Sequence, residues 1–183
     1  MDEYIDILND TGEISGKTCL KSEAHKKGLF HQSVHIWIAD FEKNVLIQKR
    51  ASNKDVFPNL WDVSVAGHIS AAEKPEISAI REIEEEVGLS VSKEELHYIG
   101  TSKKNVIHTN NLIDNELHHI YICSKKFQID TLKIQKEEVA EIKTIKLEHL
   151  IHKVSEGKNN FVPHGNNYYN FVFNAIKKDT LFK

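Results

Sequence analysis

Residues 67–89, GHISAAEKPEISAIREIEEEVGL, carry the strongest structural signal in the chain. Pro75 suits the first position of a helix, and Gly88 suits its C-terminal stop. Between them apolar side chains recur at helical spacing, at Ile77, Ile80, Ile83 and Val87. The pattern predicts a helix over 75–87 that follows a loop over 67–74.

This helix also brings carboxylates together. At about 100° per residue, Glu82, Glu85 and Glu86 fall within roughly one third of its circumference, on the side away from the apolar residues. Like charges at this spacing repel, and a helix C-terminus disfavours anions. A hard cation such as Mg²⁺ or Mn²⁺ would offset the repulsion, because it prefers oxygen ligands. Glu73 can fold back onto the same face, and Arg81 can orient a glutamate. A solvated acidic face is the alternative interpretation.

The complete spacing resembles the Nudix box, G-x5-E-x7-R-E-U-x-E-E-x-G-U, in which U is bulky and aliphatic. The matching positions are Gly67, Glu73, Arg81, Glu82, Ile83, Glu85, Glu86, Gly88 and Leu89. The resemblance implies an α+β Nudix fold, which is an α/β/α sandwich around a mixed β-sheet. It implies hydrolysis of a diphosphate linked to another moiety, X, with Mg²⁺ or Mn²⁺. It also implies that Glu82, Glu85 and Glu86 bind metal while Arg81 orients a glutamate.

Hydrolysis requires a base for the attacking water, and a carboxylate near the metal can supply it. Which residue does so varies among Nudix enzymes. Glu85 and Glu116 are the two candidates in this chain.

The sequence ahead of the box resembles the isopentenyl-diphosphate isomerase branch of the Nudix superfamily. The likeness is carried by residues 61–68, WDVSVAGH, with Arg50, Lys54 and Pro58 before them. In those isomerases two basic residues grip the diphosphate, and they correspond to Arg50 and Lys54. Lys21 lies at a similar place before His25, so all three basic residues are candidate substrate contacts.

The metal-binding set of that branch has counterparts here as well. His25, His31, His68 and Glu116 resemble it, although the interval from His25 to His31 is one residue shorter. Histidines of this kind are also common as surface or helix-capping residues. By this resemblance His25, His68 and Glu116 are possible metal ligands in addition to the box glutamates.

Two features separate this chain from the isomerases. They carry a catalytic cysteine directly before the Gly-His pair, where this chain has Ala66, whose methyl group cannot exchange a proton with an alkene. They also depart from the R-E-U-x-E-E consensus, which this chain keeps in full. Both features favour a MutT-like hydrolase built on an isomerase-like chain. An isomerase and a non-catalytic Nudix module that binds a ligand are the alternatives.

The whole chain sets broader limits. Its 183 residues fit one domain, residues 1–183, and a net charge of -3 provides no field for wrapping a nucleic acid. An apolar stretch of about 18 residues is absent from the sequence, so we expect no membrane segment and a cytoplasmic location. Cys19 and Cys123 are interpreted as reduced thiols. A small diphosphate is the expected partner, and a homodimer is left open.

The remaining elements follow from local patterns. We expect Ser22 to cap a short helix that ends at Gly28, and His118 and His119 to be structural. We interpret 161–169 as a candidate lid on the substrate side, and Glu137, Glu138 and Glu141 as exposed. Strands are predicted over 4–8, 33–39, 45–50, 61–66, 96–101, 117–124 and 140–147, and further helices over 148–155 and 168–177.

Overall fold

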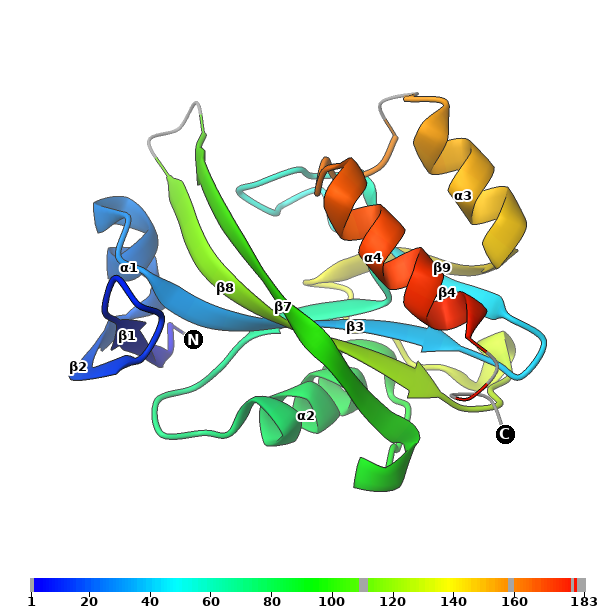
Figure 1. Ribbon diagram of the computed structural model, residues 1–183, viewed down its shortest axis with the longest axis horizontal. Coiled ribbons are helices and arrows are strands. Elements are labelled where there is room, and N and C mark those ends of the chain that lie inside the picture. The colour runs from blue at the N-terminus through cyan, green and yellow to red at the C-terminus, as the bar shows by residue number, and fades with distance from the viewer. Residues whose placement is uncertain (1, 109–111, 158–159, 179, 181–183) are drawn as a thin grey trace.

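The fold is a mixed β-sheet with helices on both faces, seen in a computed structural model (Figure 1). The structure describes residues 2–108, 112–157, 160–178 and 180. The strands are β1 Tyr4–Leu8, β2 Ile14–Leu20, β3 His31–Ala39, β4 Asn44–Arg50, β5 Trp61–Asp62, β6 Val65–His68, β7 Leu96–Ile107, β8 Ile113–Ser124 and β9 Val139–Lys146. The helices are α1 Lys21–Lys27, α2 Pro75–Val87, α3 Leu147–Ser155 and α4 Asn166–Lys177, with 3-10 turns at Lys93–Glu95 and Ile129–Thr131.

Strand β3 is the centre of the sheet. It runs parallel to β8, from the His31–Glu116 pair to the Ala39–Ser124 pair, and antiparallel to β1, β4 and β6. Strand β7 pairs with the outer side of β8, and β9 pairs with β4. Because paired residues project on the same face, this register decides which side chains of β3, β6 and β8 meet.

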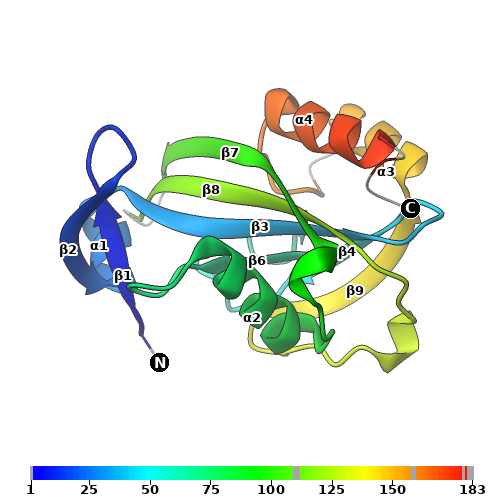
Figure 2. The ribbon, with the colours of Figure 1, turned by 60° about the horizontal axis from the view of Figure 1, so that its bottom comes forward.

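The helices divide between the two faces of the sheet. Figure 2 shows α2 below the sheet and α3 and α4 above it, while α1 lies beside β1 and β2 at one end. This arrangement confirms the expected α/β/α sandwich around a mixed sheet. The helix over 75–87 is also confirmed, with Gly88 in the left-handed conformation at its C-terminus.

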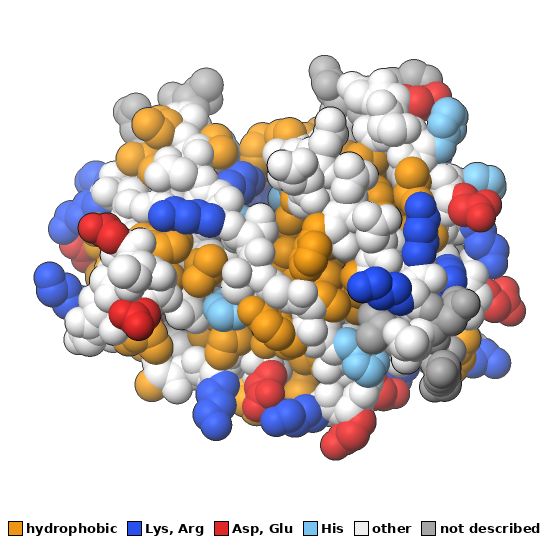
Figure 3. Space-filling view, viewed as in Figure 1, with side chains coloured by type: hydrophobic (Ala, Val, Ile, Leu, Met, Phe, Trp, Pro, Cys, Tyr) orange, Lys and Arg blue, Asp and Glu red, His pale blue; other side chains and the backbone are white. Residues whose placement is uncertain are grey.

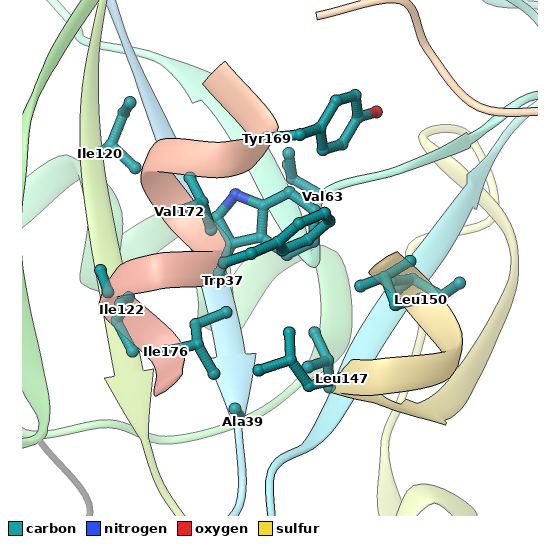
Figure 4. Packing of buried hydrophobic residues seen from close by; sticks show 14 of the residues in the cluster. Trp37, Ala39, Val63, Ile120, Ile122, Leu147, Leu150, Tyr169, Val172 and Ile176 are labelled. Carbon is teal, nitrogen blue, oxygen red and sulfur yellow. The ribbon is translucent and has the colours of Figure 1, made fainter. Parts of the chain in front are cut away.

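Each face has its own apolar core. Under α2, Ile83 and Val87 pack on Val34, Ile36 and other buried residues of the sheet. On the opposite face Trp37 lies between α4 and the sheet (Figure 4). Around Trp37 are residues of β8, α3 and α4, namely Ile120, Ile122, Leu147, Leu150, Val172 and Ile176.

Three local expectations were wrong. The predicted strand over 61–66 is two strands, because the strand pairing is interrupted at Val63 and Ser64. There the Ser64 hydroxyl donates to the Leu46 carbonyl and accepts from the Ile38 N–H. The second strand continues to His68, so the loop begins later than expected. Ser22 does not cap α1; it lies inside the helix, and its hydroxyl donates to Asp2.

The third error concerns which side of α2 is buried. Ile77 is 49% exposed, whereas Glu82 and Glu86 are buried beside Ile83 and Val87. Small side chains at 78 and 79 extend this buried stripe and let the helix approach the sheet closely. Two of the three box carboxylates therefore face the protein, and only Glu85 is exposed.

Other features agree with the sequence or stay untested. Cys123 is buried and Cys19 is half-buried, and both are free thiols. In the described part of the chain, no helix is long and apolar enough to cross a membrane. The single-domain organisation, the cytoplasmic location and the homodimer remain predictions.

Truncation of Ile176 tests how much α4 contributes to stability. Ile176 is fully buried against the sheet, so Ile176→Ala should lower the free energy of unfolding by about 3 kcal/mol. The matched control is Asn174→Ala on the exposed side of the same helix, with an expected change within about 0.5 kcal/mol. Urea unfolding measures both, and similar values for the two variants would contradict the packing of α4.

Candidate functional site

Strand β6 separates two groups of polar side chains. Its residues alternate between the faces, so Gly67 faces α2 while Ala66 and His68 face the opposite side. A Cβ atom on Gly67 would lie 2.1 Å from the Glu82 Cδ atom. Only glycine therefore leaves room for the Glu82 carboxylate against the strand.

Arg81 joins the carboxylates on the α2 side. Its Nη1 donates to Glu82 at 2.8 Å and to Glu85 at 3.0 Å, and its Nε and Nη2 donate to the two oxygens of Glu73. Nη2 also donates to the His68 carbonyl at 3.2 Å, which ties the helix to β6. The expectation that Glu73 returns to this face is confirmed. Arg81 contacts three carboxylates, and its role in orienting a glutamate remains a prediction.

Two carboxylates of α2, Glu82 and Glu86, are buried, and burial makes their charged forms less stable. Burial raises the pKa of Glu82 to about 7, although Arg81 opposes the shift. Burial raises the pKa of Glu86 well above its usual range, and the nearby charges of Glu82 and Glu138 add to the effect. The Gln48 amide donates to Glu86 at 3.1 Å. Such carboxylates favour either a proton or a cation beside them.

The residues on this side fit a hard divalent cation. The Gln48 Oε1 atom, next to Glu86, is buried and has no hydrogen-bond partner among the described residues. Oxygen atoms of this kind are the ligands that Mg²⁺ prefers. The binding of metal by Glu82, Glu85, Glu86 and Glu73 remains a prediction.

A separate cluster lies on the other side of β6. His25 from α1, His31 from β3, His68 from β6 and Glu116 from β8 bring ligand atoms within 4.8 Å of one another. In the residues that the structure describes, this is the one group of three or more His, Cys, Asp or Glu ligand atoms so close. We call these four residues the histidine cluster. The one-residue difference in spacing does not prevent His31 from joining it.

Neighbouring groups orient the cluster. The Leu29 carbonyl contacts His31 Nδ1 at 2.8 Å, and the Asp114 carboxylate lies 3.3 Å from His25 Nδ1. His31 Nε2 is buried without a hydrogen-bond partner among the described residues. Backbone and carboxylate partners of this type hold metal-binding imidazoles in position, so the residues present fit a transition metal.

The protonation states of His31, His68 and Glu116 also suit a metal. Burial alone would lower the pKa of His25, but its contacts with Asp114 and Glu116 outweigh burial and raise that pKa. Burial lowers the pKa of His31, and it lowers that of His68 well below its ordinary value. Burial alone would raise the pKa of Glu116, but its contacts with His118, His68 and His31 hold that pKa well below the usual range. Neutral imidazoles and an ionised carboxylate are the forms that bind metal.

The three candidate substrate contacts have partners in the fold. Arg50 donates to the Val56 carbonyl and to the Asp62 carboxylate, and Lys54 pairs with Glu138. Lys21 lies 3.4 Å from Glu3 at the start of α1. Glu138 is thus part of this region rather than simply exposed. A role for these bases in substrate binding remains a prediction.

Several polar residues near the site were not predicted from the sequence. His118 Nδ1 lies 2.7 Å from the Ser33 hydroxyl, which donates to Glu116 at 2.8 Å. His164, in the segment interpreted as a lid, contacts Asp62 at 2.6 Å. The one available signal was the alternation of His31, Ser33 and His35 along β3, because it places three polar side chains on one face.

The molecular surface is hollowed at one edge. Figure 3 shows a notch at the top edge, between the β7–β8 hairpin and the side formed by α3 and α4, with basic and histidine side chains visible in it. Phe57, in the loop between β4 and β5, has its ring centroid 5.3 Å from that of His108, and Lys104 Nζ lies 5.0 Å from the Phe57 centroid. Ala66, in place of the isomerase cysteine, is paired with His35 across the sheet.

Comparisons with known proteins agree with this geometry. The family model described as NUDIX domain matches residues 29–165. An uncharacterized Nudix hydrolase of Clostridium acetobutylicum is 34% identical, over 97% of this chain and 98% of its own length. An isopentenyl-diphosphate Delta-isomerase of Photorhabdus laumondii is 31% identical, over 80% of this chain and 79% of its own. A crystal structure of DR0079 from Deinococcus radiodurans superposes with a TM-score of 0.71 at 17% identity, covering 96% of this chain and all of that one.

Replacement of Asp62 tests the buried contacts beside the site. Burial alone would raise the pKa of Asp62, but His164 and Arg50 hold it well below its usual value. Its folded pKa is therefore the lower one, and its stabilising effect is complete above about pH 3.8 and is lost as the pH falls below that. Asp62→Asn should cost about 2 kcal/mol of unfolding free energy at pH 7.

Urea unfolding between pH 7 and pH 3 measures this difference. Asp10→Asn, at an exposed turn residue, is the matched control and should change little. The difference in unfolding free energy between the wild type and Asp62→Asn should become smaller below pH 3.8. A difference that grows steadily below that pH would contradict the stabilising contacts of Asp62 with His164 and Arg50.

Proposed function

The chain belongs to the Nudix hydrolase family, and from that premise we propose that it cleaves the diphosphate linkage of a small organic diphosphate. The substrate class is a nucleoside diphosphate or another diphosphate whose second moiety, X, is organic. The observation that carries the proposal is the burial of Glu82 and Glu86 without enough positive charge to balance them. A pure binding module has no need to retain these costly groups.

Magnesium or manganese is the proposed cofactor of the box. When bound, the metal would neutralise charge on the diphosphate oxygens and make water a better nucleophile. Glu82, Glu85 and Glu86 would hold it, and Glu73 would extend the set. Arg81 fixes the directions of Glu82 and Glu85 through its two short hydrogen bonds. Gln48 does the same for Glu86.

The reaction also requires a general base and side chains that bind the phosphate groups of the substrate. A carboxylate takes one proton from water while the water oxygen bonds to phosphorus and the P–O bond to the leaving phosphate group breaks. Glu85 and Glu116 remain the candidates for this base. Arg50, whose guanidinium is fixed by Val56 and Asp62, would bind phosphate oxygens together with Lys54 and Lys21.

A second metal is proposed for the histidine cluster. Three imidazoles and one carboxylate favour a transition metal such as Zn²⁺ or Mn²⁺ over Mg²⁺. Because the four ligands come from α1, β3, β6 and β8, a metal here would hold four elements together. Its contribution would include stability as well as any part in the reaction.

An isomerase is the second candidate function, and the relative from Photorhabdus laumondii favours it. Ala66 argues against it, because a methyl group cannot deliver or remove a proton. Incubation with isopentenyl diphosphate in deuterated buffer separates the two activities, since an isomerase incorporates deuterium into the C5 products. We expect no incorporation.

Removal of single box carboxylates tests the hydrolase. Glu85→Gln and Glu86→Gln should each lower kcat for metal-dependent cleavage by at least about 100-fold, since even residues that only orient metal ligands cost roughly 10- to 100-fold. The assay follows the cleavage of nucleotide, dinucleotide, prenyl and thiamine diphosphates with Mg²⁺ or Mn²⁺ by chromatography of the products, because a dinucleotide yields two monophosphates rather than free phosphate.

Glu84→Gln is the matched control for these variants. Glu84 lies on the same helix, next to Glu85, and is exposed, so its variant should retain wild-type turnover. Equal losses in all three variants would point to a general electrostatic effect. Saturable ligand binding by the wild type without turnover would favour a binding module instead.

Replacement of His31 tests the second metal. His31→Gln should reduce the Zn²⁺ or Mn²⁺ bound per chain and should abolish the rise in Tm that the metal gives to the wild type. Elemental analysis and thermal unfolding measure the two effects. His152→Gln, at an exposed histidine of α3, should behave as the wild type. The same metal content in all three proteins would contradict the site.

A further inference from the structure

The sheet face beneath α4 is apolar along only half of its length. Moving back along β3 from Trp37, the next residues on this face are His35, Ser33 and His31. Along β8, Ile120 is followed in the same way by His118 and Glu116. All five polar residues are buried. Apolar side chains would be more stable at such positions, so the polar half is better explained by binding than by stability.

Three imidazoles are packed together in this polar half. His35 stacks on His118 with ring centroids 3.9 Å apart, and its edge contact with His164 has centroids 5.1 Å apart. His35 Nδ1 contacts the Tyr168 hydroxyl at 2.8 Å, and that hydroxyl accepts from Trp37 Nε1. The first turn of α4 thus fixes the ring between the other two histidines.

Contacts with Asp62 determine which nitrogen of His164 carries hydrogen. His164 Nε2 donates to Asp62 Oδ1 at 2.6 Å, and Arg50 donates to the other oxygen of the same carboxylate. The proton therefore resides on Nε2, and burial lowers the pKa of the ring, which keeps it neutral near pH 7. Nδ1 is left as a hydrogen-bond acceptor.

Two imidazole nitrogens in this group lack hydrogen-bond partners among the residues described. They are His164 Nδ1 and His118 Nε2, on either side of His35. His118 directs its other nitrogen toward Ser33 and Glu116. A buried acceptor without a donor is costly, so His164 Nδ1 requires a donor from outside the described protein atoms.

A metal is a poor explanation for these two nitrogens. In the described part of the chain, His35, His118 and His164 do not form a group of ligand atoms within 4.8 Å, whereas the histidine cluster does. A hydrogen-bond donor can pair with an imidazole nitrogen without several ligand atoms lying close together. Hydroxyl and amine groups are such donors, and a hydrocarbon chain has none.

We infer that His164 Nδ1 accepts a hydrogen bond from a hydroxyl or amine group of the moiety X. This inference rests on the proposed function and narrows its substrate class. The enzyme then prefers diphosphates of polar moieties, such as sugars and nucleosides, over diphosphates of hydrocarbon alcohols. A site built to bond a hydroxyl rejects the analogue that lacks it, because its own polar atoms are left unpaired. His164 is thus a specificity-determining residue, and Asp62 is the residue that positions it.

The test compares two ligands that differ by one hydroxyl. They are dimethylallyl diphosphate and 4-hydroxy-3-methylbut-2-enyl diphosphate, with cytidine diphosphate as a third probe. Titration calorimetry with Ca²⁺ in place of Mg²⁺ measures binding rather than turnover. The wild type should bind the hydroxylated C5 compound and cytidine diphosphate about tenfold more tightly than dimethylallyl diphosphate, as expected for one hydrogen bond of about 1.4 kcal/mol.

Two variants at His164 separate recognition from folding. His164→Gln keeps an amide donor for Asp62 but lacks an acceptor at Nδ1, so the affinity ratio should fall to about twofold or less. His164→Asn places its amide near Nδ1 and should retain more of the ratio. The matched control is His119→Gln. His119 Nε2 is also buried and unpartnered among the described residues, but the ring borders a separate cavity of about 400 Å³ beside Tyr98 and Tyr121.

The outcomes are distinct for this inference and for the proposed function. Equal binding of the two C5 compounds by the wild type would overturn the inference, whatever the variants do. So would a loss in His164→Gln that is the same for both compounds, since that indicates a structural role. Absence of metal-dependent cleavage of every diphosphate in the panel would reject the hydrolase, while the affinity ratio would still decide the role of His164.

Discussion

The burial of two carboxyl side chains on one helix is the constraint on which this site depends. Glu82 and Glu86 project from α2 toward the sheet rather than into water. The fold accommodates Glu82 with the fork of Arg81 and with Gly67, the residue that leaves space for a carboxylate against β6. It accommodates Glu86 with Gln48, which supplies one hydrogen bond and no charge. The remaining imbalance favours a bound cation, which is why catalysis and metal binding are proposed for the same place.

Strand β6 connects this helix to the second half of the site. Because its side chains alternate, four residues serve both faces: Gly67 meets Glu82 on one side, and His68 joins the histidine cluster on the other. Arg81 reaches the His68 carbonyl and thereby fixes one face to the other. A displacement of β6 would therefore disturb the box carboxylates and the imidazoles together.

The likeness to isomerases and the loss of their cysteine are compatible within this geometry. The histidine cluster and the bases ahead of the box lie on a framework that both groups share, whereas the identity of residue 66 changes the chemistry that the pocket can perform. Ala66 is paired with His35 across the sheet and packs against the apolar cluster that contains Trp37. A buried imidazole and an unreactive methyl group suit a hydrolase whose substrate carries hydroxyl or amine groups.

The sequence by itself determined the helix over 75–87, the family and the candidate ligands, because fixed spacing along one helix needs no knowledge of distant residues. It did not determine which side of that helix is buried. Ile77 is exposed and Glu82 is buried because the helix packs against β6 at Gly67. The resemblance to the isomerase branch supplied His25, His31, His68 and Glu116 as a set, and the tertiary structure shows that they converge. Tertiary structure alone decided that His164 meets Asp62, which lies 102 positions earlier in the chain. Contacts of that kind depend on strand register and helix docking, and neither is encoded in local periodicity.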